Sequence, residues 1–162
     1  MHRPDSLWAS HIPVLVRALQ ITTGPVLEVG AGMMSTPLLH TMCADQGRKL
    51  VSYDNDNRYV DLLRKFRNAD HEITLVTDWE EIDEKIKSID WGIAFIDHKP
   101  EGRRNEEIKK LANNAEFIIV HDSNDPAYHY EKIYSLFKYR FDYTKPQQHT
   151  MVLSNVREFQ YE

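Results

Sequence analysis

Five short apolar segments recur along the chain, and each carries an acidic residue at or just before its end. In chain order they are "PVLEV", "KLVSYD", "EITLVTD", "GIAFID" and "EFIIVHD". Polar segments with helical spacing separate them, and such alternation predicts βαβ units that build a mostly parallel sheet covered on both faces. In sheets of this kind, ligands bind outside the carboxyl ends of the strands. The acids expected at that edge are Glu28, Asp54, Asp78, Asp97 and Asp122.

The remaining pattern completes one α/β domain that spans residues 1–162, a length typical of a single domain. Pro13 and Pro37 suit the first turn of a helix, and Gly47 suits a helix end. The predicted fold is a three-layer αβα sandwich around a seven-stranded, mostly parallel sheet. The expected helices are 8–19, 35–47, 57–70, 80–89, 101–114 and 126–139, and the last two strands, 140–145 and 149–155, form an expected hairpin.

The composition restricts the classes of function. The formal net charge is −5, which disfavours sequence-independent binding to nucleic acid, because such binding depends on neutralising phosphates. The apolar runs are too short to span a membrane, and the N-terminal segment lacks the apolar core of a signal peptide. Cys43 is the single cysteine, so an internal disulfide is excluded. We therefore expect a cytoplasmic protein without a nucleic-acid or membrane partner.

The segment "LEVGAGMMS" places Gly30, Ala31 and Gly32 between the first strand and the following helix. Glycines at this point let the backbone turn tightly and approach a ligand closely. Asp54 lies 22 residues after Gly32 (54 − 32), at the end of the second strand, where a carboxylate can accept hydrogen bonds from both hydroxyls of a ribose. The pattern favours a nucleotide-like ligand. An ordinary strand–helix turn with solvated acids is the alternative.

Two features of this loop distinguish among nucleotide ligands. Ser35 stands where a dinucleotide fingerprint has its third glycine, and the loop lacks the lysine of a phosphate-binding P-loop. The carboxylate of Glu28 disfavours a pyrophosphate and favours a ligand with a cationic end. An NAD-dependent dehydrogenase is therefore a weaker alternative.

Together with "VSYDND", the loop resembles the first two motifs of the class I, Rossmann-fold S-adenosylmethionine-dependent methyltransferases. "VTDW" is similar to the region of that family that frames adenine, and "FIDH" to its fourth-strand motif, which faces the methyl group. The resemblance implies S-adenosylmethionine as cofactor, a Rossmann-like sheet with a reversed last strand, and an N-terminal helix within residues 1–22 over the cleft. The cofactor-binding residues that it implies are Glu28, Gly30, Ala31, Gly32, Ser35, Thr36, Asp54, Asn55, Asp78, Trp79, Asp97 and His11.

The segments "FIDHKPEGRR" and "FIIVHDSND" are similar to strand ends of the catechol-type, metal-dependent O-methyltransferases. In that family two aspartates and an amide hold Mg²⁺, and a lysine acts as the base. The resemblance implies a magnesium site at Asp97, Asp122 and Asn124. Two departures bear on this interpretation, because Ser123 occupies the amide position itself and Lys99 stands one residue early for the base.

The same region offers chemistry without a metal. Histidine titrates near neutral pH, so His98 is a candidate base beside Asp97 and Lys99, and these three form the expected catalytic set. His121 is a candidate for the same role or for substrate contact. A structural histidine at the strand end is the alternative for His121.

A substrate-contacting set follows from charge and position. Arg103 opens a helix, where positive charge opposes the helix dipole, and this mismatch indicates an anionic group on the substrate. His121 and Tyr128 are expected beside it. A solvated helix face is the alternative, and we expect it more for Arg104 than for Arg103.

These observations favour methyl transfer from S-adenosylmethionine to a small-molecule acceptor, at an oxygen atom, in a chain that can form a homo-oligomer. In such a reaction the protein mainly supplies proximity, alignment and a base. Two alternatives use the same cofactor: cyclase or lyase chemistry, and a cofactor-binding subunit without catalysis.

Overall fold

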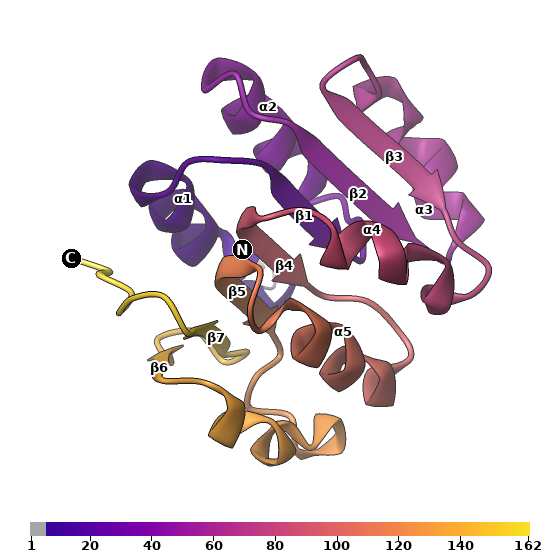
Figure 1. Ribbon diagram of the computed structural model, residues 1–162. Helices are drawn as coiled ribbons and strands as arrows, with labels where there is room; N and C mark the ends of the chain where they lie inside the picture. The colour runs from indigo at the N-terminus through magenta and orange to yellow at the C-terminus, as the bar shows by residue number, and fades with distance from the viewer. Residues whose placement is uncertain (1–5) are drawn as a thin grey trace, which may run out of the picture.

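The computed structural model describes residues 6–162, with only the backbone at positions 6, 7 and 101; the first five residues of the expected N-terminal segment, 1–22, lie outside the described part. One seven-stranded sheet runs through the molecule in the order β3-β2-β1-β4-β5-β7-β6 (Figure 1). The strands are β1 (Val26–Val29), β2 (Leu50–Asp54), β3 (His71–Leu75), β4 (Trp91–Ile96), β5 (Ala115–His121), β6 (Tyr139–Tyr143) and β7 (Thr150–Ser154).

The sheet has the predicted direction of its strands. Neighbours from β3 to β5 pair in parallel, whereas β7 pairs antiparallel with both β5 and β6. The predicted α/β fold with a reversed strand is thereby confirmed. Strand order reverses between β1 and β4, so the loops that follow these two central strands diverge to opposite faces. The carboxyl ends at this switch point are where open α/β sheets bind ligands.

Two hydrophobic clusters cover the two faces of the sheet, because successive side chains of a strand point in opposite directions. In β4, Ile93 and Phe95 pack on one face, while Ala94 and Ile96 pack on the other. The first face is covered by α1 (Ile12–Ile21) and α2 (Thr36–Asp45), with α3 (Asn57–Leu63) beside β3. The second is covered by α4 (Asp83–Lys87) and α5 (Arg104–Leu111).

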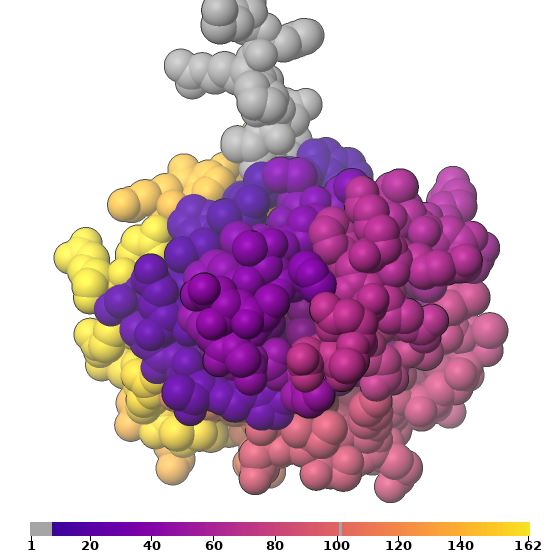
Figure 2. Space-filling model, turned by 90° about the horizontal axis from the view of Figure 1, so that it is seen from above, coloured from indigo at the N-terminus to yellow at the C-terminus, as the bar shows by residue number. Residues whose placement is uncertain are grey.

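The C-terminal segment completes the cover of the first face. Phe159 packs edge-on against Phe117 of β5, and Arg17 of α1 donates to the carbonyl oxygens of Gln160 and Glu162. Figure 2 shows the result from above: α1 and α2 occupy the centre of the view, and the yellow C-terminal segment lies along the edge beside α1.

Short 3-10 helices replace several of the expected α-helices. The segment expected as one helix over 126–139 forms three 3-10 turns, η5 (Pro126–Tyr128), η6 (Tyr130–Lys132) and η7 (Tyr134–Leu136). Helical spacing predicts that Ile133, Leu136 and Phe137 point inward, whereas Leu136 is exposed. His129 ends the first turn with φ of 53°, a left-handed conformation that stops helix propagation. The remaining 3-10 helices are η1 (Ser6–Ala9), η2 (Arg64–Phe66), η3 (Trp79–Ile82) and η4 (Glu101–Arg103).

The spacing of Tyr59, Leu62, Leu63 and Phe66 predicts that these residues share the apolar face of the helix, and α3 differs from this prediction. Leu63 is buried and packs near Val60 and Phe66, whereas Leu62 and Tyr59 are exposed.

A separate finding concerns membranes: within residues 6–162, no helix has both the length and the apolar content required to cross a bilayer.

Candidate functional site

The loop after β1 lies directly against the end of β4. Gly30 has φ of 98°, and a Cβ atom at this position would lie 2.5 Å from the backbone carbon of Asp97 and from the backbone nitrogen of His98. The amide of Gly30 donates to the carbonyl oxygen of Tyr53 at 2.9 Å, and so does the amide of Ala31 at 3.2 Å. Only glycine fits this conformation and this close approach. The loop is therefore fixed between the carboxyl ends of β2 and β4.

Glu28 lies beneath this loop and is fully buried. Its carboxylate accepts hydrogen bonds from the hydroxyls of Ser35 at 2.6 Å, Thr36 at 2.9 Å and Ser52 at 2.6 Å. Burial raises the pKa of Glu28 to about 7, although these hydroxyls act in the opposite direction. The expected contact of Glu28 with a cofactor does not fit this geometry, because the carboxylate is turned into the protein and its oxygens serve the loop and the start of α2.

The sequence predicts Ser35 or Thr36 as the N-terminal capping side chain of α2, and the same network corrects this prediction. The hydroxyl of Ser35 donates to Glu28 and does not act as a helix cap, and the hydroxyl of Thr36 accepts from the amide of Gly32 at 3.0 Å. Both residues are buried. Their hydroxyls stabilise the glycine loop through Gly32 and Glu28, so this structure does not indicate a direct contact of their side chains with a ligand.

Asp54 ends β2 beside the loop and is 8% exposed. One carboxylate oxygen accepts from the amide of Asp56 at 2.7 Å. Burial raises the pKa of Asp54 to about 6, against the backbone hydrogen bonds from Asp56 and Ala31. The position of this carboxylate at the end of β2, beside the loop, suits the predicted contact with a ribose diol.

The two residues that were expected to frame adenine, Asp78 and Trp79, have other partners in this structure. Asp78 caps η3 by accepting from the amide of Glu80 at 3.0 Å and forms a capping box with Glu81. Trp79 is buried, packs on His98 with ring centroids 4.4 Å apart, and donates its indole N–H to the carbonyl oxygen of Lys99 at 2.8 Å. The Trp79 ring therefore belongs to the core, and a stacking role for it against adenine does not fit.

At Lys99, the backbone carbonyl oxygen makes the hydrogen bonds that connect this residue to the site. Its carbonyl oxygen also accepts from the side-chain amide of Asn55 at 3.3 Å, which links the ends of β2 and β4. The peptide bond from Lys99 to Pro100 is cis.

A buried arginine joins the ends of β4 and β5. Arg104 is 2% exposed, and its guanidinium donates to the carboxylate of Asp97 at 2.9 Å and to the carbonyl oxygens of His98 at 2.7 Å and His121 at 2.9 Å. The Asp122 carboxylate lies 3.8 Å from the same guanidinium. The expectation of a solvated Arg104 is wrong, because α5 begins at this residue and turns its side chain inward.

His121, the last residue of β5, forms a hydrogen-bonded chain with two other elements. Its Nδ1 lies 3.3 Å from the Asp97 carboxylate, and its Nε2 lies 2.8 Å from the hydroxyl of Ser10, which precedes α1. Burial alone would lower the pKa of His121, but the hydrogen bond and charge of Asp97, together with Asp122, raise it. For Asp97, burial alone would raise the pKa, whereas His121 and Arg104 lower it.

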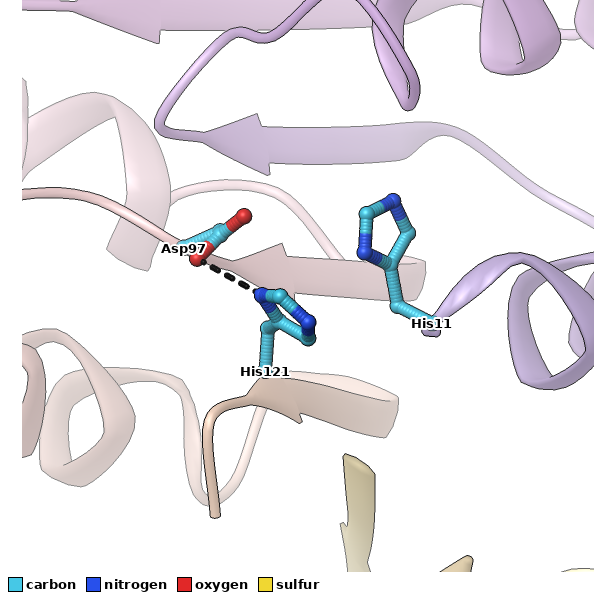
Figure 3. Close-up of side chains that lie close together, drawn as sticks. All are labelled: His11, Asp97 and His121. Carbon is cyan, nitrogen blue, oxygen red and sulfur yellow. Dashed lines mark hydrogen bonds and ion pairs between the residues drawn. The ribbon is translucent and has the colours of Figure 1, made fainter. Parts of the chain in front are cut away.

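His11 completes this group from the N-terminal side. Its ring packs on Phe95 with centroids 4.8 Å apart and meets the ring of His121 edge-on at 4.7 Å. Figure 3 shows His11, Asp97 and His121 converging from the start of α1, the end of β4 and the end of β5. Burial lowers the pKa of His11 to about 4, with a further decrease from His121, so the imidazole is neutral at pH 7. N-terminal residues thus lie over the strand ends.

His98 and Arg103 point to the opposite side of the strand ends. The Nε2 of His98 lies 3.0 Å from the carboxylate of the fully buried Glu107, and Arg103 donates to the same carboxylate at 2.9 Å. Burial lowers the pKa of His98, against the effect of Glu107. These contacts correct two predictions: His98 does not face the loop as a base, and Arg103 pairs with acids of the protein.

Tyr128 is buried under the arginine. The guanidinium of Arg104 lies 4.4 Å from its ring centroid, and Tyr128 stacks on Tyr130 with centroids 5.3 Å apart. A direct contact of Tyr128 with a substrate does not fit this position. The aromatic pair instead supports the arginine that orients Asp97.

Comparisons with solved structures identify the fold. The chain is similar to spermidine synthase from Thermotoga maritima, with a TM-score of 0.65, 15% identity, and coverage of 93% of this chain and 60% of that one. It is also similar to TrmK from M. capricolum in complex with S-adenosyl-homocysteine, with a TM-score of 0.60, 10% identity, and coverage of 90% and 69%. Human methyltransferase-like protein 13 in complex with SAH matches with a TM-score of 0.59, 11% identity, and coverage of 91% and 79%.

The chain has the fold of the class I S-adenosylmethionine-dependent methyltransferases. It spans about 60% of the length of the spermidine synthases that it matches. A scan against family models and a search of curated proteins gave no match. This is the fold that the sequence resemblance implied from the glycine loop and the strand-end motifs.

The residues of the expected magnesium site, Asp97, Asp122 and Asn124, have other partners in this fold. The side-chain amide of Asn124 accepts from the backbone amide of His149 at 2.8 Å and donates to the carbonyl oxygen of Gln147 at 3.2 Å, so it links the loop after β5 to the loop before β7. Between Asp97 and Asp122 lies the guanidinium of Arg104. The guanidinium therefore occupies the space between the two carboxylates, where an ion that bridges Asp97 and Asp122 would have to lie.

A cavity of about 330 Å³ opens beside the strand ends. Its walls come from the loop after β5 and the loop before β7. The lining residues are Asp122, Asn124, Asp125, Pro126, Gln147 and Gln148. A second cavity of about 410 Å³ lies at the outer edge of β3 and α3, away from Asp97 and the glycine loop.

Two contributors to the site were missed in the sequence. Arg104 could have been found from the helical register, because Ile108 and Leu111 of the same helix are buried and lie four and seven positions later (108 − 104 and 111 − 104). Ser10 gave no comparable signal, since its partner His121 lies 111 residues away.

Proposed function

We propose that this chain transfers a methyl group from S-adenosylmethionine to a small-molecule acceptor, at an oxygen atom. The observation that carries the proposal is the close approach of Gly30 to Asp97, which sets a glycine loop against the ionisable cluster of β4 and β5. Cofactor and acceptor would thus meet at the carboxyl edge of the sheet. Two structures with this fold, TrmK and human methyltransferase-like protein 13, contain S-adenosyl-homocysteine, which supports the choice of cofactor.

In the proposed reaction the acceptor oxygen attacks the methyl carbon in line with the sulfur. The bond from carbon to sulfur breaks, a bond from carbon to oxygen forms, and S-adenosyl-homocysteine leaves without the sulfonium charge. The proton of the acceptor hydroxyl passes to water. The sulfonium makes the methyl group reactive, so the protein contributes alignment and electrostatic stabilisation.

Individual residues support these roles. Asp54, with its carboxylate at the end of β2, would accept hydrogen bonds from the ribose hydroxyls. Asp97 would face the methyl group and the acceptor oxygen, held in place by Arg104. The cavity of about 330 Å³ beside Asp122 has the size of a small-molecule site, and the net charge of −5 favours an acceptor other than nucleic acid.

Calorimetric titration with S-adenosyl-homocysteine tests the cofactor assignment. We expect the wild-type chain to bind and Asp54→Asn to lose about tenfold to a hundredfold in affinity, because a buried diol loses a charged acceptor. Asp70→Asn is the control, since Asp70 is an exposed acid paired with Lys49. Failure of the wild-type chain to bind would overturn the proposal.

Product analysis tests the reaction. With a panel of hydroxylated small molecules, we expect S-adenosyl-homocysteine and a methylated acceptor in equal amounts. Release of methylthioadenosine in place of S-adenosyl-homocysteine would contradict methyl transfer. It would indicate lyase chemistry, or transfer of a group from another carbon of the cofactor. Binding without turnover on any acceptor would instead identify a cofactor-binding subunit.

A further inference from the structure

His11, Asp97 and His121 form a cluster of metal-ligating side chains at the edge of the sheet. One ligand atom from each residue lies within 4.8 Å of the other two. His11 and His121 are 2% and 4% exposed, and Asp97 is partly buried (Figure 3). Three separate elements supply these residues, so the cluster exists only in the folded chain.

The ring of His11 provides an independent observation. Both of its nitrogen atoms are buried, and neither has a hydrogen-bond partner among the described residues. Buried polar atoms are paired in the great majority of proteins, and an unpaired one points to a missing ligand or ion.

The side chains of His121 and Asp97 accept or donate hydrogen bonds of the kind that orient metal ligands in proteins. The Nδ1 of His121 faces Asp97, while its Nε2 contacts the Ser10 hydroxyl at 2.8 Å; a hydrogen bond on the far nitrogen orients most metal-binding histidines. Arg104 orients the Asp97 carboxylate in the same way. The distance of 3.3 Å between Nδ1 and the carboxylate oxygen suits two ligands of one ion, each roughly 2.0–2.2 Å from the metal.

We propose that His11, Asp97 and His121 bind a first-row divalent transition metal, for which Zn²⁺ is the probe, and do not bind Mg²⁺. Two imidazoles and one carboxylate suit zinc or iron(II), whereas magnesium prefers oxygen ligands. His11 has to move toward the other two side chains by roughly 1 Å to reach a shared ion. The ion takes the place of the proton on His121 Nδ1.

The metal would have an open position toward the acceptor. A metal-bound hydroxyl loses its proton to water more easily than a free one, which would generate the attacking oxygen beside the methyl group. This role rests on the proposed function, but binding of the metal itself does not depend on it. The two can therefore be tested separately.

Calorimetric titration of the full chain with Zn²⁺, with and without S-adenosyl-homocysteine, tests the site. We expect one Zn²⁺ per chain, retained in excess Mg²⁺. His11→Phe and Asp97→Asn should each lose more than about a hundredfold in affinity, and Ser10→Ala about tenfold to a hundredfold. His40→Gln is the matched control, because His40 and His71 form a second imidazole pair with Nδ1 atoms 3.0 Å apart.

Circular dichroism and thermal unfolding first establish that each variant is folded. X-ray absorption of the zinc-loaded chain should then show two imidazole ligands. Absence of Zn²⁺ binding, displacement by Mg²⁺, or loss of affinity in His40→Gln but not in His11→Phe would overturn the inference. If the wild-type chain binds S-adenosyl-homocysteine but not Zn²⁺, the metal site alone is refuted. If the wild-type chain binds Zn²⁺ but not S-adenosyl-homocysteine, the cofactor assignment alone is refuted.

Discussion

Replacement of Arg104 by methionine tests how the site is held together. Methionine fills a similar volume, so the change mainly removes the guanidinium. That group pairs with Asp97 at 2.9 Å and donates to the carbonyl oxygens of His98 and His121, all in a place that is 2% exposed. Asp97 and Asp122 would then lie close together without their shared cation.

The expected loss follows from these contacts. Removing one partner of a buried ion pair destabilises a protein by about 3–5 kcal/mol, because the remaining charge stays buried without compensation. In a chain of this size, such a loss lowers the unfolding midpoint by about 6–20 °C. The contacts form one network, so their individual contributions do not add.

The assay is urea unfolding of Arg104→Met, followed by circular dichroism. Arg58→Met serves as the control, because the Arg58 side chain is 89% exposed, and its unfolding midpoint should match the wild type. The double variant Arg104→Met with Asp97→Asn should recover part of the loss, with a coupling energy of about 0.5–3 kcal/mol. A loss below 1 kcal/mol in Arg104→Met would refute the assignment of the arginine as the link between β4 and β5.

Three further predictions concern groups whose pKa is shifted by burial. Because burial raises the pKa of Glu28 from 4.5 to about 7, its contribution to stability is fully present below pH 4.5 and is lost as pH rises to about 7. The free energy of unfolding should therefore decrease by up to about 3 kcal/mol over this window, and the decrease should be absent in Glu28→Gln. Because the pKa of Asp54 is about 6, affinity for S-adenosyl-homocysteine should be constant above pH 7 and fall below pH 6, and calorimetry of Asp54→Asn should show no such fall. His11→Phe should stabilise the metal-free chain by about 1–3 kcal/mol in urea unfolding, since it removes a buried ring without hydrogen-bond partners among the described residues; destabilisation would contradict this explanation.

The alternation of apolar and polar segments was sufficient to predict the fold. Strands that are buried on both faces read as continuous apolar runs, and intervening helices force them to be parallel. The seven-stranded, mostly parallel sheet follows from this local pattern, whereas its reversed last strand was implied by the family resemblance. The segment after β5 was the exception, because the left-handed His129 breaks a helix that the spacing of its apolar residues predicted.

The sequence also located the site at the correct edge. Gly30 and Asp54 could be placed because a tight turn and a strand-end carboxylate are local requirements. Glu28 was expected to face the ligand from the end of the first strand. The alternation of side chains in β1 turns it into the protein, where Ser52 of the neighbouring strand meets it.

Only the tertiary structure decided which charges meet. Arg103 and Arg104 are neighbours in sequence, yet a rotation of about 100° per residue directs one toward Glu107 and the other between Asp97 and Asp122. The sequence by itself determined the order of strands and helices, the glycine loop and the row of acids, since these depend on nearest neighbours. The pairing of His121 with Ser10, across 111 residues, depends on how helices pack over the sheet, and local sequence does not encode that distance.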